Sequence, residues 1–143
     1  MRVLEVSGLP ERPSAAAAAF HAEWLPQAWA LLKPLPFRGG DGGGGCHHPL
    51  SRPDNPHPNP SPEGEGLLVI AFDAADYTHT GWRLAAVQML AREYAPARVN
   101  AVSGGGAAAQ AAALAYLADG AGITGQYLPL DDAGAGPVVI APE

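Results

Sequence analysis

The sequence contains a single cysteine, Cys46, which excludes an intramolecular disulfide and favours a reducing compartment. Positive charge is also scarce, with 8 Lys and Arg residues against 14 Asp and Glu residues and a net charge of -6. Lys33 is the only lysine, and the arginines are scattered singly along the chain. Because nucleic acids are bound by clustered cations, we expect no nucleic-acid partner.

Long apolar runs are absent as well. No stretch approaches the roughly 20 apolar residues of a membrane-spanning helix, so we expect no membrane partner. Glu5 interrupts the first apolar run, and we expect no secretory leader because a charged start followed by an apolar core is missing. Together with the single cysteine, these absences predict a cytoplasmic protein.

Residues 38–66 differ from the rest because Gly and Pro dominate them. Glycine makes the backbone flexible, proline removes hydrogen-bond donors, and only Leu50 offers a large aliphatic side chain for burial. We therefore predict a disordered insert within a single domain of residues 1–143. The run 56–66 is similar to the translation of a bacterial intergenic repeat element, which favours an insertion over a lid. We expect no metal site, since no recognised spacing joins the candidate ligands Cys46, His47, His48 and His57.

Outside the insert, short apolar runs alternate with helical patterns. The apolar runs predict strands at 2–7, 67–72, 98–103, 126–130 and, more briefly, 137–140. Helical spacing of apolar residues predicts helices at 15–33, 82–94 and 107–118. Ser14 and Thr80 are the expected N-caps, Pro26 should kink or split the first helix, and Pro129 favours an edge strand. The order β-α-β-α-β-α-β predicts an α/β fold with a parallel sheet between helices.

Two stretches resemble one family. Residues 90–104, LAREYAPARVNAVSG, resemble the "LAxEyAP" helix end and "RVNxVxPG" strand of short-chain dehydrogenases/reductases (SDR). Residues 123–131, ITGQYLPLD, resemble the later "ITGQxxxVDGG" stretch of the same family. The resemblance implies the C-terminal half of a three-layer Rossmann-like fold, with about four parallel strands and without the N-terminal nucleotide-binding half. Within it, Arg98 and Asn100 are expected to be structural, through hydrogen bonds at a strand end.

The resemblance also implies NAD(P), but this sequence lacks the matching cofactor site. The family binds the cofactor pyrophosphate with a Gly-rich turn after its first strand, and this chain matches only later strands. We therefore expect no bound NAD(P). Free N–H groups before the third helix suit a phosphate or a carboxylate, although a plain turn explains the same glycines. The remaining cofactor-binding candidates are Gly104, Gly105, Gly106 and Thr124.

The family's catalytic pair is a tyrosine with a lysine four residues later. One register places Asp76 and Thr80 at these positions, and a shift by one residue places Tyr77 and Gly81 there. Neither register gives the pair, and a phenol without a nearby cation is a poor base at neutral pH. An alternative is a rebuilt site at the end of the central strand, with Asp76 orienting an acid–base His79 beside Tyr77. The same residues also suit a polar loop that caps a helix.

Two functions follow from these patterns. The first is a short-chain dehydrogenase-like protein without oxidoreductase activity that forms a homodimer or binds a related subunit. The resemblance implies that helices 15–33 and 82–94 form this contact, through Phe20, Trp24, Trp29, Trp82, Val87, Met89, Leu90 and Tyr94. The second is an NAD(P)-dependent oxidoreductase or ligand binder with a rebuilt site at Asp76, Tyr77 and His79. A third alternative is a gene remnant without a selected role, whose sequence would look the same as that of the inactive protein.

Overall fold

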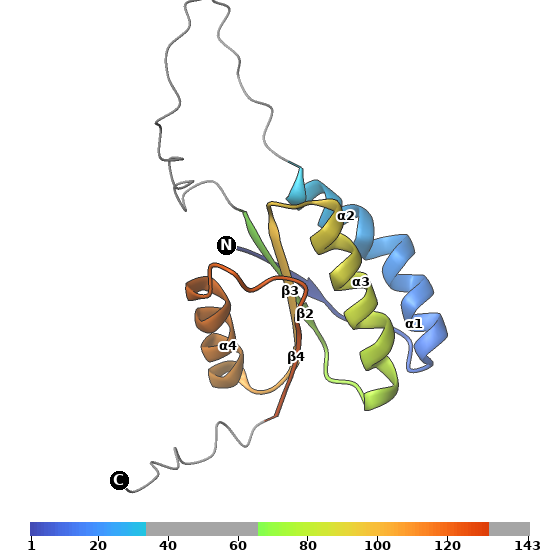
Figure 1. Ribbon diagram of the computed structural model, residues 1–143. Coiled ribbons are helices and arrows are strands. Elements are labelled where there is room, and N and C mark those ends of the chain that lie inside the picture. The colour runs from blue at the N-terminus through green and yellow to red at the C-terminus, as the bar shows by residue number, and fades with distance from the viewer. Residues whose placement is uncertain (34–65, 132–143) are drawn as a thin grey trace, which may run out of the picture.

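The computed structural model describes residues 1–33 and 66–131, and it contains one parallel sheet (Figure 1). Four strands form this sheet in the order β1-β2-β3-β4. The bounds are Arg2–Val6 for β1, Leu67–Phe72 for β2, Arg98–Gly104 for β3 and Tyr127–Leu130 for β4. The predicted α/β class is confirmed. The expected strand at 137–140, and all of the expected insert except Gly66, lie outside the described residues.

The central strand of the prediction, β2, lies between two parallel neighbours. Leu68 is the register partner of Arg2 in β1 and of Val99 in β3. Every residue of β2 except the half-buried Ala71 is buried, which is typical of an apolar strand covered on both faces. At the far side β4 is an edge strand, as the proline at position 129 predicted.

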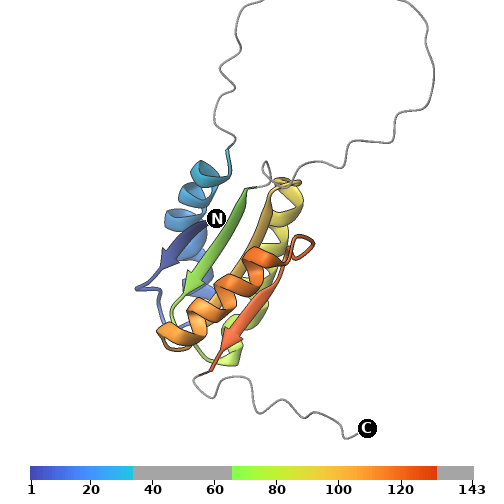
Figure 2. The ribbon, with the colours of Figure 1, turned by 90° about the vertical axis from the view of Figure 1, so that its left-hand side faces the viewer.

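Helices cover both faces of the sheet and create three layers. α1 (Pro13–Ala19), α2 (Leu25–Leu32) and α3 (Thr80–Glu93) pack on one face, whereas α4 (Ala107–Asp119) packs on the other. Figure 2 shows α4 alone in front of the strands. Each connection moves one strand farther in the same direction across the sheet. Because the third connection runs over the opposite face, its hand is opposite to that of the first two.

The first helical segment is divided before Pro26, as its sequence predicted. A π-helical turn, η1 (Phe20–Trp24), separates α1 from α2, and the N–H of Leu25 donates to the carbonyl of Phe20, five residues earlier. Pro26 has no N–H and cannot donate an α-helical hydrogen bond. The wider π-helical turn therefore lies just before the position where this donor is missing. The predicted cap at Ser14 is wrong, because Pro13 starts α1 and Arg12 occupies the N-cap position.

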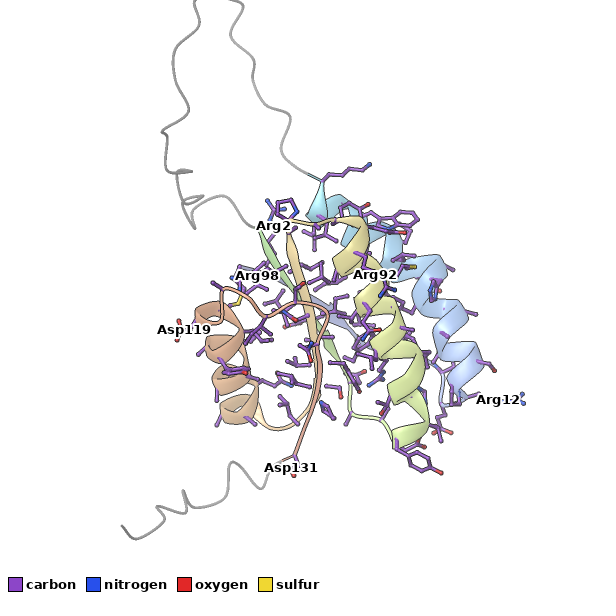
Figure 3. The ribbon with its side chains drawn as sticks, viewed as in Figure 1. Arg2, Arg12, Arg92, Arg98, Asp119 and Asp131 are labelled. Atoms are coloured by element: carbon purple, nitrogen blue, oxygen red, sulfur yellow. The ribbon has the colours of Figure 1, made fainter. Side chains whose placement is uncertain are left out.

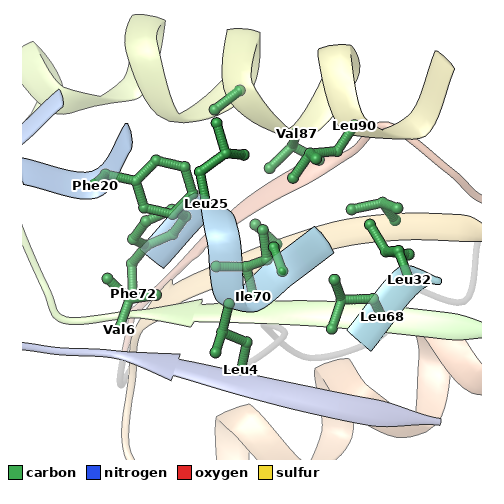
Figure 4. Packing of buried hydrophobic residues seen from close by; sticks show 14 residues of the cluster. Leu4, Val6, Phe20, Leu25, Leu32, Leu68, Ile70, Phe72, Val87 and Leu90 are labelled. Atoms are coloured by element: carbon green, nitrogen blue, oxygen red, sulfur yellow. The ribbon is translucent and has the colours of Figure 1, made fainter. Parts of the chain in front are cut away.

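The larger core lies between the sheet and the layer formed by α1, α2 and α3 (Figure 4). Phe20, Val87 and Leu90 are fully buried in this core. The sequence analysis placed them in a subunit contact, but their side chains do not reach the surface of the chain. A smaller core lies under α4, where Val69 of β2 and Leu117 are fully buried. Within residues 1–33 and 66–131, no helix has the length and apolar character required to cross a membrane.

Candidate functional site

The candidate residues lie at the carboxyl edge of the sheet. All four strands are parallel, so the loops that follow β1, β2 and β3 meet at one edge, which is where open α/β sheets bind ligands. The loop after β2 begins at Asp73 and enters a short 3-10 turn, η3 (Tyr77–His79), before α3. Three of the predicted catalytic candidates, Asp76, Tyr77 and His79, therefore occupy one short segment.

Asp76 caps the 3-10 turn. Its Oδ1 atom accepts a hydrogen bond from the backbone N–H of Thr78 at 2.9 Å and a second one from the Thr78 hydroxyl. The hydroxyl bond, followed by the backbone bond, lowers the pKa of Asp76 below its usual 3.8, and the nearby His79 adds a smaller effect. Thr80 is the first residue of α3 rather than its cap, so the prediction for Thr80 is wrong. The N-cap residue of α3 is His79, and the side-chain cap made by Asp76 belongs to η3, which precedes the helix.

The buried side chain of His79 connects the start of α3 to the loop after β1. Its side chain is 4% exposed, and its Nε2 atom lies 2.9 Å from the carbonyl oxygen of Glu11 in the loop after β1. Trp82 donates its indole N–H to Nδ1 of the same ring at 3.3 Å. Since Nδ1 accepts, the proton sits on Nε2 and is donated to Glu11. Both ring nitrogens are therefore engaged in contacts within the fold.

A second hydrogen bond joins the loop after β1 to the loop after β2. The Oδ2 atom of Asp73 accepts a hydrogen bond from the N–H of Gly8 at 3.1 Å. Gly8 has a φ of 72°, a conformation that glycine adopts without strain. The hydrogen bonds of Asp76 come from Thr78, whereas His79 bonds with Glu11 and Trp82. The described contacts thus do not form the Asp–His pair that the sequence analysis considered.

Tyr77 does not join this cluster. Its side chain is 87% exposed, the most exposed of the large hydrophobic residues in the described part of the chain. No hydrogen bond, ring contact or cation contact connects the side chain of Tyr77 to another described residue, although its backbone carbonyl accepts a hydrogen bond from the N–H of Thr80. Its neighbours in η3 therefore hold the backbone of Tyr77, while the phenol itself lies in solvent.

Gly104, the last residue of β3, forms a tight turn with the two glycines that follow it. Gly104 and Gly105 have φ values of 67° and 70°, which residues with a side chain rarely adopt. A Cβ atom on Gly105 would lie 2.7 Å from the Cβ of Leu130, so the turn also packs too closely on β4 for a side chain. Gln110 donates from Nε2 to the carbonyl of Gly104 at 3.1 Å, and Gly106 is the N-cap residue of α4.

Thr124 lies away from these glycines. Its Oγ1 atom accepts a hydrogen bond from the N–H of Val99 at 3.1 Å, near the beginning of β3. Gly104 is the last residue of the same strand. The structure thus places Thr124 and the glycine turn at opposite ends of β3, and it does not bring the four cofactor-binding candidates together.

Arg98 and Asn100 have the structural contacts that were predicted for them. Arg98 donates from Nη1 to the carbonyls of Leu117 and Gly120 at 3.0 and 2.6 Å, which satisfies the end of α4 (Figure 3). Asn100 is fully buried and donates to the carbonyl of Ile123 at 2.9 Å. These two side chains attach β3 to the segment that leads into β4.

The sequence analysis missed a buried polar group at the same carboxyl edge. Arg83 is 2% exposed and donates from Nη1 to the carbonyl of Asp73 at 3.0 Å and to the hydroxyl of Tyr127 at 3.2 Å. The Tyr127 hydroxyl lies 2.7 Å from the Oγ atom of Ser103. One signal was available, because Arg83 is four and seven residues before the core residues Val87 and Leu90 and shares their helix face.

The comparison with protein families gives one match. A family model described as "Short chain dehydrogenase-like protein" matches residues 58–130, just over half of the chain. The matched range includes β2, α3, β3, α4 and β4, and therefore the whole segment from Asp73 to the glycine turn. No curated protein and no solved structure matches the chain.

Proposed function

Because this chain belongs to the short chain dehydrogenase-like family, we propose that it is an associating subunit without oxidoreductase activity. The observation that carries the proposal is the structural engagement of the candidate catalytic group. One ring nitrogen of His79 contacts Glu11 in the loop after β1 and the other accepts from Trp82 in α3, while the Oδ1 atom of Asp76 accepts from Thr78. Tyr77, the remaining candidate, has a solvent-exposed phenol.

Among the described residues, no cation contacts Tyr77, and this supports the same proposal. Acid–base chemistry by a phenol at neutral pH requires a positive group that stabilises the phenolate. In the described part of the chain, the cation nearest in sequence is Arg83, which donates to Tyr127 instead. Arg83 therefore does not stabilise a phenolate at Tyr77.

The association surface that we propose is the outward side of the layer formed by α1, α2 and α3. Trp29 on α2 is 39% exposed. Ala22, Pro26 and Ala30 are exposed on the same segment and carry no charge. Since Phe20, Val87 and Leu90 belong to the core, the contact depends on Trp29 and its small neighbours rather than on the larger set predicted from sequence. A second copy of the chain is the partner that the family resemblance implies.

Light scattering over a concentration series tests the association. We expect a dimer at micromolar concentration, and we expect Trp29→Glu to shift the protein to monomer by placing a charge in the contact. Tyr116→Glu is the matched control, because Tyr116 is a 60% exposed aromatic residue on α4, on the other face of the sheet. A wild-type monomer at all concentrations, or a dimer that tolerates Trp29→Glu, would contradict the proposal.

A cofactor titration tests the lack of oxidoreductase activity. NADH and NADPH are added separately while tryptophan fluorescence is recorded, since Trp82 lies beside the carboxyl-edge loops. We expect no saturable change up to millimolar cofactor. Saturable binding in the micromolar range would overturn this part of the proposal and would favour the rebuilt site.

A further inference from the structure

Arg83 is a buried cation whose protein partners are uncharged. Its described hydrogen-bond acceptors are the carbonyl of Asp73 and the hydroxyl of Tyr127. Its Cζ atom lies 4.6 Å from the ring centre of Phe72 and 5.6 Å from that of Trp82. A guanidinium stays charged in proteins, and these dipoles and aromatic faces compensate only part of its lost hydration.

The guanidinium also has a donor without a partner. Both of its hydrogen bonds to described residues start from Nη1. The Nε atom is buried and has no hydrogen-bond acceptor among residues 1–33 and 66–131. Buried donors are satisfied in almost every folded protein, so an orphaned N–H on a charged group indicates a missing acceptor. The Nε side of a guanidinium is an edge that binds carboxylates in a planar geometry.

The two hydroxyl groups next to Arg83 add a further donor. Tyr127 and Ser103 have one hydroxyl hydrogen each, and one of these forms the 2.7 Å bond between them. The second hydroxyl hydrogen is available to another acceptor. Arg83, Tyr127 and Ser103 come from α3, β4 and β3, so the donors converge at the carboxyl edge, beside a loop that is exposed from residue 73 to residue 78.

We propose that Arg83 anchors a binding site for the carboxylate group of a small organic acid. A carboxylate supplies the acceptor that Nε lacks and the single negative charge that balances the guanidinium. A doubly charged phosphate fits less well, because Asp73 and Asp76 already place exposed carboxylates on the adjacent loop. The second oxygen of the ligand binds Nη2, which shares an edge of the guanidinium with Nε, whereas the Tyr127 hydroxyl holds Nη1 on the other side.

The test is an NMR titration with acetate, in which the Nε–H signals of the arginines are followed. Chloride at equal ionic strength is the reference titration. We expect the Arg83 signal to move downfield and to saturate, because its N–H gains a charged acceptor. The signal of Arg98 is the internal control, because that guanidinium already donates to carbonyls at the end of α4. An Arg83 signal that stays in place, or moves only in parallel with the Arg98 signal, overturns the proposal.

Two variants make the test specific. Arg83→Lys keeps the charge but removes the Nε–H edge, so we expect acetate binding to weaken at least tenfold, measured by tryptophan fluorescence. Arg12→Gln removes an exposed cation and should leave binding unchanged. If Arg83→Lys fails to fold, the wild-type titration still decides the question. Acetate affinity that is equal in wild type and in a folded Arg83→Lys contradicts the proposed anchor.

Discussion

The Nε2 atom of His79 lies 2.9 Å from the carbonyl oxygen of Glu11, which joins the start of α3 to the loop after β1. The contact connects residues that are 68 positions apart in the chain. It closes a long stretch of sequence at the carboxyl edge of the sheet and leaves the imidazole without a free nitrogen. The candidate that most resembled an acid–base residue is therefore part of the framework.

His79→Ala should destabilise the fold. The change removes two part-buried hydrogen bonds and leaves the Glu11 carbonyl without its partner, so we expect a loss of about 1–3 kcal/mol in the free energy of unfolding. Urea denaturation followed by tryptophan fluorescence measures it. Tyr77→Ala, two residues earlier, is the control and should change stability by less than about 0.5 kcal/mol because Tyr77 is exposed. Equal stability of the two variants would show that the contacts of His79 do not stabilise the fold.

The Asp76 cap should make stability depend on pH. The Thr78 hydrogen bonds lower the pKa of Asp76 below 3.8, so the ionised form is favoured in the folded state. For a lowered carboxyl pKa, the stabilisation is present above the unfolded-state pKa and is lost as pH falls through the folded-state pKa. We therefore expect the stability difference between wild type and Asp76→Ala to be constant at neutral pH. It should shrink below about pH 4, as measured by urea denaturation across pH.

Asp76→Asn separates charge from hydrogen bonding in that experiment. Asparagine retains an acceptor for the N–H of Thr78 but does not titrate. Its stability relative to Asp76→Ala should not vary with pH across the acidic range. A pH-dependent difference between these two variants would mean that another carboxyl group causes the effect.

The apolar pattern of the sequence predicted the fold well because long-range packing agreed with it. The unbroken run of β2 indicated a strand covered on both faces, and Pro26 indicated the division between α1 and α2. The cap positions were less predictable. Ser14 is a favourable cap residue, but Pro13 starts the helix one residue before it. A side chain can cap a helix only where the backbone leaves it, and that position is set by neighbouring turns.

The site was harder to predict because its contacts come from distant segments. The contacts of His79 with Glu11 and of Arg83 with Tyr127 join residues that are 68 and 44 positions apart, so they depend on the arrangement of the whole sheet. Sequence spacing placed Asp76 and His79 close together, but it does not give the direction of each side chain. An arginine within an apolar stripe was the one available signal of the buried polar group.

Leu90 and Leu84 allow the core and the outer face of α3 to be compared with one residue type. Leu90 is fully buried between α3 and the sheet, so Leu90→Ala should cost about 2–5 kcal/mol by removing packed methyl groups. Leu84 is half-buried, and Leu84→Ala should cost clearly less. Chemical denaturation at several protein concentrations gives both values. A Leu90→Ala effect that disappears on dilution would assign Leu90 to a subunit contact instead of the core.

Gly105→Ala should destabilise the turn after β3 for two reasons. Its φ of 70° disfavours any side chain, and the new Cβ would lie 2.7 Å from the Cβ of Leu130. We expect a loss of more than about 1 kcal/mol in the free energy of unfolding. Gly81→Ala is the matched control, because Gly81 lies in α3 with open space around its Cβ position. This second change should stabilise the protein by about 0.4–1 kcal/mol. Thermal and urea unfolding of both variants check the opposite signs, and a neutral Gly105→Ala would show that the turn relaxes away from β4.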